Sequence, residues 1–515
     1  MHRKLPSLFA CIETALVFGV FCLEGAWPPP DTNEPHYLGK ARHYWDPSWC
    51  EHDFFLNSAD THLFFYLTAG WVIRALSFPA AAIVGRGVTY ALMAIGWRRL
   101  SHAIVPWRGA AVLSAALFVA LNYRCHMAGE WVVGGFEAKG IAYALVFFAL
   151  ALAVEGQWNG AWIAGGAASA FHVLVGGWST LALGLAWWLL GANRPPLRSM
   201  LPGLMIGGIL ALPGVVPGLA LTKGAAPQIV AQANELYVYE RLPHHLWPAK
   251  MQPQLIERFL LLSAVWVALC AFTISDPRQA VIRRMVAAAL GFAAAGWVIS
   301  LAAPLWPVQV AGLLKFYWFR SSDAMVPLGA ALIGIAWLRQ QAQAGDWRRA
   351  LPLVAVLVVA GHFVALTRVR WNNPTPRADA RGKVVDHAQW CDACAWIQQN
   401  TPVDAVFLTP RSCQTFKWYA QRGEVVTWKD VPQDALELVA WWRRMEDVHG
   451  KSFGDGPNDR FYNSLSETSV AHLVRVAQKY GAQFVITECE LPLALPCLYQ
   501  NEVYAVYDLQ PTRGE

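Results

Sequence analysis

Long apolar stretches recur along the first 370 residues of this chain, and they limit its possible folds more than any other feature. A helix that crosses a bilayer needs about 20 mostly apolar residues, because its backbone groups must be satisfied within the helix. The composition agrees, since 56% of the residues are hydrophobic and 15% are charged, against roughly 45–50% and 25% in soluble domains. We therefore predict a polytopic membrane protein, which excludes a disordered chain, a coiled coil and an ordinary soluble enzyme. The candidate spans, about eleven, cover residues 5–23, 79–97, 109–123, 140–154, 158–173, 176–191, 200–222, 255–274, 285–303, 324–338 and 350–367.

Two regions leave the assignment of spans open. Segments 158–173 and 176–191 are short and are joined through a Gly-Gly pair, so they form either two spans or one broken, re-entrant pair. Segment 61–78 is apolar but contains a histidine and an arginine. Because a charge near the middle of a bilayer is costly, we expect this segment to lie in the plane of the interface.

The basic residues form short clusters between the apolar stretches, which is typical of topology signals rather than of a face that binds nucleic acid. With eleven spans and a cytoplasmic N-terminus, every basic cluster falls on the cytoplasmic side and the acidic loops fall outside. A bacterial inner membrane fits this composition. The basic clusters are Arg3/Lys4, Arg98/Arg99, Arg194/Arg198, Arg278/Arg283/Arg284 and Arg339/Arg348/Arg349, and the acids are Asp31, Glu34, Asp46, Glu51, Asp53, Glu130, Glu137, Glu235 and Glu240.

The last part of the chain, residues 371–515, is polar and has the pattern of a folded domain. Strands are predicted at 405–408, 424–428, 483–487 and 503–509, and helices at 390–399, 434–445 and 468–480, the last ending at Gly481. We predict a small α/β domain outside the cytoplasm, in the periplasm of a bacterium. It follows a membrane domain of residues 1–370, whose outside loops are 26–78, 124–139 and 223–254.

Cysteines outside the predicted spans include the pair Cys391 and Cys394, two residues apart. This spacing suits a redox pair, half of a zinc site, a local disulfide or two plain thiols. Because no second pair of this kind and no nearby His-x-x-x-His accompany it, we favour a disulfide or thiols.

The first outside loop is dense in carboxylates, histidines and aromatic residues. A carboxylate at the membrane face can act as a general base toward a hydroxyl, or can hold a divalent cation through its oxygens. Acidic residues that only remain solvated are the equally weighted alternative. The candidates for catalysis are Asp31, Glu34 and Asp53, with His36 and Tyr37 as substrate contacts.

Two further outside loops carry ionisable residues. Glu137 and Lys139 lie where a predicted span begins, a position that favours function for Glu137 and snorkelling for Lys139. Arg241 precedes the adjacent pair His244 and His245, and together they suit an anion such as phosphate. A loop that simply packs on the bundle is the alternative there.

Arg320 and Asp323 follow a run of aromatic residues just outside a span. An arginine at the level of the lipid headgroups suits a phosphate. A simple ion pair between the two residues, three positions apart on a helix, is the alternative. A single cleft that faces the lipid would bring all of these clusters together.

The whole arrangement resembles the GT-C glycosyltransferases, which include protein O-mannosyltransferases, aminoarabinose transferases and the oligosaccharyltransferase catalytic subunit. The resemblance rests on the N-inside bundle, on an acidic first loop of the form Asp31-x-x-Glu34-x-x-Tyr37, and on the terminal α/β domain. It implies that Asp31 or Glu34 is the catalytic base and that Arg320 contacts the phosphate of a lipid-linked donor. Many such enzymes have adjacent Asp-Glu in this loop, so the choice of base stays open.

These observations predict an inverting glycosyltransferase that uses a sugar linked to polyprenyl phosphate. The acceptor hydroxyl belongs to a lipid, a glycan or a protein, and a divalent cation is an optional cofactor. The alternative is a scaffold of the cell envelope without catalytic activity, or a transporter, with an outside domain that binds a partner. Few charged residues lie inside spans and the two halves show no symmetry, which disfavours transport.

Overall fold

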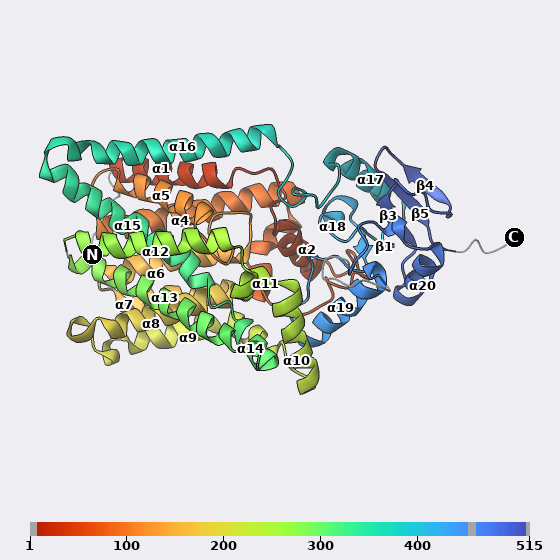
Figure 1. Ribbon diagram of the computed structural model, residues 1–515, viewed down its shortest axis with the longest axis horizontal. Helices are drawn as coiled ribbons and strands as arrows, with labels where there is room; N and C mark the ends of the chain where they lie inside the picture. The colour runs from red at the N-terminus through yellow and green to blue at the C-terminus, as the bar shows by residue number, and fades with distance from the viewer. Residues whose placement is uncertain (1–7, 275, 452–459, 511–515) are drawn as a thin grey trace. The chain divides into compact units, whose positions relative to one another are not determined.

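The structure, a computed structural model, describes residues 8–274, 276–451 and 460–510 (Figure 1). Arg3 and Lys4, used above for orientation, lie outside these residues. The contacts divide the chain into two compact units, and each unit combines segments that are far apart in the sequence. Unit 1 consists of Met1–Ala26, Val84–Gly218 and Asn234–Asn373, and unit 2 of Trp27–Ile83, Leu219–Ala233 and Pro374–Glu515.

Unit 1 is a bundle of helices whose long axes run side by side in Figure 1. Each predicted span falls on an α-helix. The helix bounds are α1 Leu8–Gly25, α4 Phe78–Ile104, α5 Ala110–Arg124, α6 Ala138–Val154, α7 Trp158–Phe171, α8 Val173–Leu189, α9 Leu197–Ala220, α12 Pro253–Phe272, α13 Ala280–Leu301, α15 Arg320–Ala344 and α16 Leu351–Asn372.

Several of these helices have the length and composition needed to cross a membrane. Seven candidates are found among the described residues, within Leu8–Gly25, Phe78–Ile104, Leu197–Ala220, Pro253–Phe272, Pro277–Leu301, Arg320–Ala344 and Asp346–Asn372. Helices α5, α6 and α8 are apolar but shorter. On α9, α12 and α16 most apolar side chains are exposed, as in helices that face lipid. The protein is an integral membrane protein.

Charged residues inside the bundle have partners. Glu13 interrupts the first predicted span and is almost fully buried in α1. Its carboxylate accepts a hydrogen bond from Arg98 Nε at 3.1 Å and another from the backbone N–H of Gly109 at 3.1 Å. A buried carboxylate is tolerated when it is paired in this way.

The short helices α7 and α8 follow each other directly. His172 separates them, and its Nδ1 accepts a hydrogen bond from the backbone N–H of Val175 at 3.3 Å, so that this histidine caps α8. Segment 61–78, predicted to lie in the interface plane, forms α3 Leu63–Leu67 and a 3-10 turn η1 Ala69–Arg74, both too short to cross a bilayer. The remaining short elements of the long loops are α10 Pro227–Glu235, a π-helical turn η3 Leu236–Arg241, α11 Pro243–Leu246, η4 Pro248–Lys250 and α14 Pro307–Leu314.

Unit 2 contains a mixed five-stranded sheet in the order β2-β1-β3-β5-β4. Strand β1 is parallel to β2 and β3, whereas β5 is antiparallel to β3 and β4. Three predicted strands fall on β1, β3 and β5, and the fourth is reduced to the two residues of β2. Strand β4 was not predicted from the sequence; its residues are mostly exposed and it lies at the edge of the sheet. The bounds are β1 Val406–Leu408, β2 Gly423–Glu424, β3 Phe484–Glu488, β4 Cys497–Gln500 and β5 Tyr504–Asp508.

Helices α17 His387–Asn400, α18 Phe416–Ala420, α19 Ala435–His449 and α20 Val470–Tyr480 complete the α/β part of unit 2. Three of them match predicted helices. The last ends at Gly481, which has a left-handed φ of 73°, the conformation that a glycine adopts most easily at a helix end.

The first outside loop, predicted to belong to the membrane domain, packs on this α/β part. Its helix α2 covers Glu34–Trp45. Trp49 Nε1 donates to Gln421 Oε1 at 2.9 Å, and the rings of Phe78 and Trp418 stack with centroids 4.9 Å apart. The two segments therefore share one core.

Candidate functional site

Unit 1 contains a compact cluster of charged residues at the beginnings of two helices. Arg320 is the first residue of α15, and Lys139 is the second residue of α6. Between α5 and α6 runs a loop that supplies Glu130 and Glu137. All four side chains are largely buried, with exposed fractions between 3% and 13%.

Glu130 lies at the centre of this cluster. Its Oε2 is 3.0 Å from Arg320 Nε and 3.9 Å from Lys139 Nζ, and its Oε1 accepts a hydrogen bond from the Tyr143 hydroxyl at 3.0 Å. Glu137 Oε1 lies 3.8 Å from Lys139 Nζ. The charges of two cations and two carboxylates therefore balance in a buried environment with little water.

The two cations keep unused hydrogen-bond donors. In the described part of the chain, the terminal Nη groups of Arg320 have no acceptor, and its Nε faces Glu130 without the alignment of a hydrogen bond. Lys139 Nζ also has no hydrogen-bond acceptor there, and it lies 3.6 Å from the centroid of the Trp131 ring. A guanidinium and an ammonium with free donors at a buried site are suited to bind a phosphate group.

Asp323 is fully buried one turn further along α15 and does not pair with Arg320. Its carboxylate accepts hydrogen bonds from the backbone N–H groups of Met127 and Ala128, each at 2.8 Å, and of Glu130 at 3.3 Å. The alternative of a simple Arg320–Asp323 pair is therefore wrong. Asp323 holds the α5–α6 loop in the position that brings Glu130 to Arg320.

The loop with Arg241, His244 and His245 also belongs to unit 1. His245 Nδ1 lies 2.5 Å from the carbonyl oxygen of Ala128, and its ring is 4.0 Å from that of His244. Arg241 is buried and its charge acts on the phenol of Tyr317, whose ring lies 4.0 Å from the Arg320 guanidinium. The structure thus brings Arg241 and His245 to the surroundings of the Arg320 cluster.

The acids predicted as catalytic belong to unit 2. Glu34 begins α2, and its Oε2 accepts a hydrogen bond from the backbone N–H of Asp31 at 2.7 Å. Asp31 Oδ1 accepts from the N–H of Thr32 at 2.6 Å, and its Oδ2 lies 3.5 Å from Arg377 Nη1. Both carboxylates are buried, with at most 2% of the residue exposed.

Asp53 belongs to a buried network that joins the first loop to the C-terminal segment. Its Oδ1 accepts from the N–H of Leu56 at 2.8 Å, and its Oδ2 accepts from the N–H of Glu424 at 3.0 Å. Lys417 Nζ is 3.3 Å from Asp53 and 2.8 Å from Asp430, and it also donates to Glu424. With every oxygen of Asp53 engaged, this geometry suits a structural role rather than proton transfer.

The charged groups of this network shift one another's pKa values strongly. Burial lowers the pKa of Lys417, but the three surrounding carboxylates outweigh burial and hold that pKa well above its usual value. Burial raises the pKa of Glu424 to about 7 against the opposing charge of Lys417. Burial would also raise the pKa of Asp430, yet Lys417 and a hydrogen bond from His36 hold it far below its usual range.

The substrate contacts predicted in the first loop have internal partners. His36 Nδ1 is 3.3 Å from Asp430 Oδ1, and burial lowers the pKa of this histidine. The Tyr37 hydroxyl lies 3.2 Å from His62 Nε2. Both side chains therefore pack within unit 2.

The histidine, cysteine and acidic side chains of the described residues bear on metal binding and on disulfides. Within the described ranges, no group of three or more His, Cys, Asp or Glu side chains is arranged to hold a metal ion. All ten cysteines, which all lie in those ranges, are free thiols. The pair Cys391 and Cys394 lies on α17, where Cys394 is buried and Cys391 Sγ approaches the His387 ring at 3.7 Å.

Sequence reasoning did not single out Glu130, Lys417, Glu424 and Asp430 as members of a site. Glu130 could have been recognised as a candidate, because it lies in the same polar loop as Glu137. The other three had none, since they lie in a segment whose local pattern is that of ordinary strands and loops.

The comparisons with known proteins give one partial family profile and one listed structural match, and they assign no activity. A family profile described as a domain of unknown function, DUF6798, matches residues 388–448. No curated protein matches. Among solved structures, ArnT from Cupriavidus metallidurans in the apo state matches with a TM-score of 0.46 and 14% identity, over 98% of this chain and 97% of that one. At this identity and TM-score the match assigns neither a family nor a residue role to this chain.

Proposed function

We propose that this protein is a membrane glycosyltransferase that transfers a sugar from a polyprenyl-phosphate-linked donor to an acceptor hydroxyl outside the cytoplasm. The observation that carries the proposal is the buried pair of cations, Arg320 and Lys139, whose unused donors suit the phosphate of such a donor. The ends of apolar helices are a suitable place for a headgroup whose lipid tail remains in the bilayer. Glu130 would then keep the Arg320 guanidinium in position.

In the proposed reaction, a carboxylate takes the proton of the acceptor hydroxyl as its oxygen attacks the anomeric carbon. The bond from that carbon to the phosphate oxygen breaks, and polyprenyl phosphate leaves with the electron pair. The configuration inverts. Arg320 and Lys139 stabilise the negative charge that develops on the phosphate.

We propose Glu34 or Asp31 as the base. Glu34 begins α2 and Asp31 lies three residues before it; both carboxylates are buried, and low exposure favours a base that is not fully solvated. Asp53 is the weaker candidate because Lys417 and two backbone N–H groups already occupy its oxygens. Asp323, which holds the α5–α6 loop, is proposed as a positioning residue, together with His245.

The test measures donor binding and turnover separately, on the full chain in nanodiscs with a small panel of polyprenyl-phosphate sugars. Arg320→Ala is expected to weaken donor binding by about ten- to a hundredfold, because a charged hydrogen-bonding partner of the phosphate is lost. Arg278→Ala, which removes an exposed arginine of the same unit, is the matched control and should bind as the wild type does.

Glu34→Gln keeps an acceptor for the Asp31 N–H but cannot take up a proton. We expect it to bind donor normally and to lose turnover by roughly a hundredfold or more. If Asp31→Asn loses turnover instead, Asp31 is the base. A wild-type protein that binds no donor of the panel would contradict the enzyme assignment and favour an envelope scaffold whose outside domain binds a partner.

A further inference from the structure

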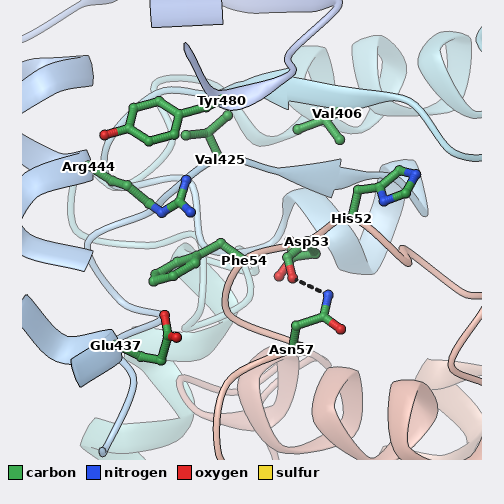
Figure 2. Close-up of a pocket in the computed structure, with 9 residues that line it drawn as sticks. All are labelled: His52, Asp53, Phe54, Asn57, Val406, Val425, Glu437, Arg444 and Tyr480. Carbon is green, nitrogen blue, oxygen red and sulfur yellow. Dashed lines mark hydrogen bonds between the residues drawn. The ribbon is translucent and has the colours of Figure 1, made fainter. Parts of the chain in front are cut away.

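Unit 2 contains a pocket with a volume of about 300 Å³, whose lining includes Asp53, the weaker candidate base, but neither Glu34 nor Asp31. Its walls come from the first loop, the sheet region and helices α19 and α20. A volume of this size suits a small ligand. Figure 2 shows the lining residues His52, Asp53, Phe54, Asn57, Val406, Val425, Glu437, Arg444 and Tyr480.

Arg444 is held in this pocket by two aromatic rings. Its guanidinium carbon lies 4.0 Å from the centroid of Phe54 and 4.5 Å from that of Tyr480, and Figure 2 shows the group between the two rings. The Tyr480 hydroxyl donates to Asp447, which lies one turn after Arg444 on α19. The ring is therefore fixed, and with it the plane of the guanidinium.

The stacking leaves the hydrogen-bonding edge of Arg444 unused. Cation–π contacts engage the faces of a guanidinium, while its five N–H groups point outward in the plane. Within the residues that the structure describes, Arg444 has neither an ion pair nor a hydrogen-bond acceptor. Burial lowers the pKa of Arg444, against the charges of Tyr480, Glu437, Asp53 and Asp447, so the guanidinium is partly desolvated and an anion bound to its N–H groups would stabilise it further.

The neighbouring carboxylate of Asp53 does not pair with Arg444. Both of its oxygens are engaged by backbone N–H groups, and Lys417, which it shares with Glu424 and Asp430, offsets part of its charge. An incoming anion therefore meets the unused N–H groups of Arg444 beside a carboxylate whose oxygens already have other partners.

Other polar groups in the pocket can accept hydrogen bonds. Asn57 uses its Nδ2 hydrogens on the carbonyl oxygens of Glu51 and Asp53, at 2.6 and 2.8 Å, which leaves its Oδ1 for another donor. The Glu437 carboxylate has no hydrogen-bond partner in the described part of the chain and lies two helical turns before Arg444. Acceptors of this kind suit the hydroxyl groups of a ligand.

We propose that this pocket binds the oxyanion of a small polyhydroxylated ligand, a carboxylate or phosphate group carried on a sugar, with Arg444 as its anchor. The oxyanion accepts from the planar edge of Arg444. Hydroxyl groups of the same ligand donate to Asn57 Oδ1 and Glu437. The proposal does not depend on the transferase activity, because it concerns binding to unit 2 alone.

The test is calorimetric titration of the full-length protein in nanodiscs with glucuronate, glucose 6-phosphate and glucose as probes. Glucuronate or glucose 6-phosphate should bind, glucose at least about tenfold more weakly, and the tighter of the two acids identifies the source of the oxyanion. Arg444→Gln should weaken the binding of that acid by about tenfold or more. Arg443→Gln, which removes the adjacent exposed arginine of α19, is the matched control and should bind normally.

If Arg444→Gln unfolds, Arg444→Lys keeps the charge but loses the planar edge, and it should still weaken binding several-fold. Three results would overturn the proposal: no binding of either acid to the wild type at millimolar concentration, equal binding of glucose, or the same loss in the Arg443 and Arg444 variants.

Discussion

A single lysine compensates three buried carboxylates in unit 2. Lys417, of which 4% of the side chain is exposed, contacts Asp53, Glu424 and Asp430. Such a network is costly to break, because removing the cation leaves negative charges without compensation in a region with little water.

We therefore predict that Lys417→Met lowers the free energy of unfolding of unit 2 by roughly 3–5 kcal/mol. Adding Glu424→Gln should restore part of this loss, since one uncompensated carboxylate is removed. Urea titrations followed by tryptophan fluorescence would measure both. Lys479→Met, which removes an exposed lysine paired with Asp447, is the control and should change little. Equal effects of the two lysine variants would refute the role given to Lys417.

We expect the stability of unit 2 to depend on pH because of a histidine on α17. His387 Nδ1 lies 3.0 Å from the buried Asp379, and this hydrogen bond raises the pKa of His387 to about 10. Because the folded pKa lies above the unfolded value of about 6.5, the contribution to stability is complete below pH 6.5 and is lost as the pH rises toward 10.

The difference in stability between wild type and His387→Gln should accordingly be largest near pH 6 and vanish near pH 10. Its size should be about 1 kcal/mol at most, because the side chain is 31% exposed and solvent screens the pair. Thermal unfolding of both proteins across this pH range provides the measurement. A difference that grows with pH would have the wrong sign for this pair.

Among the helices, α7 and α9 approach each other closely through glycines. A Cβ atom on Gly207 of α9 would lie 2.4 Å from the carbonyl oxygen of Trp162, and one on Gly166 of α7 would lie 2.0 Å from that of Gly207. Both are backbone atoms, which cannot rotate away. Small residues at a helix crossing allow van der Waals packing where lipid offers no hydrophobic gain.

This close approach of α7 and α9 leads us to expect different effects on stability from two adjacent substitutions. Gly207→Ala should destabilise the bundle by about 1–3 kcal/mol, because the helices must separate. Gly208→Ala, where a Cβ meets nothing within 4 Å, should be neutral or slightly stabilising. The melting temperatures of the two variants in detergent would show the difference, and similar values would mean that the crossing is looser than described.

At the level of the whole chain, unit 2 combines segments separated by several hundred residues. Besides the Asp53 network, the backbone N–H of Ala378 donates to the carbonyl oxygen of Pro30 at 3.2 Å, and Trp49 bonds to Gln421. The first loop therefore depends on the C-terminal segment for its fold.

A chain that ends at Asn373 should consequently lose the structure of residues 27–83 while the helices of unit 1 persist. Limited proteolysis followed by mass spectrometry should find new cleavage sites within 27–83 and protection of the bundle. If the first loop stays protected without the C-terminal segment, it folds on its own and its contacts with that segment are secondary.

The helices of this protein could be predicted because helix formation here depends only on the residues of each apolar stretch. Each apolar stretch must satisfy its own backbone in hydrocarbon, so hydropathy alone located α1, α9 and α16 and the other predicted spans. The strands β1, β3 and β5 also carry a local signal, in short runs rich in β-branched and aromatic residues. The exposed edge strand β4 lacks that signal.

The partners of the charged residues were decided by tertiary structure. Arg320 is recognisable in the sequence as a cation at the end of a span, but its partner is Glu130, and the nearby Asp323 binds a loop instead. Likewise, nothing local to Asp53 indicates Lys417 or the backbone of Glu424. Pairing over such separations depends on how the whole chain packs, and it leaves no periodic pattern along the sequence from which it could be read.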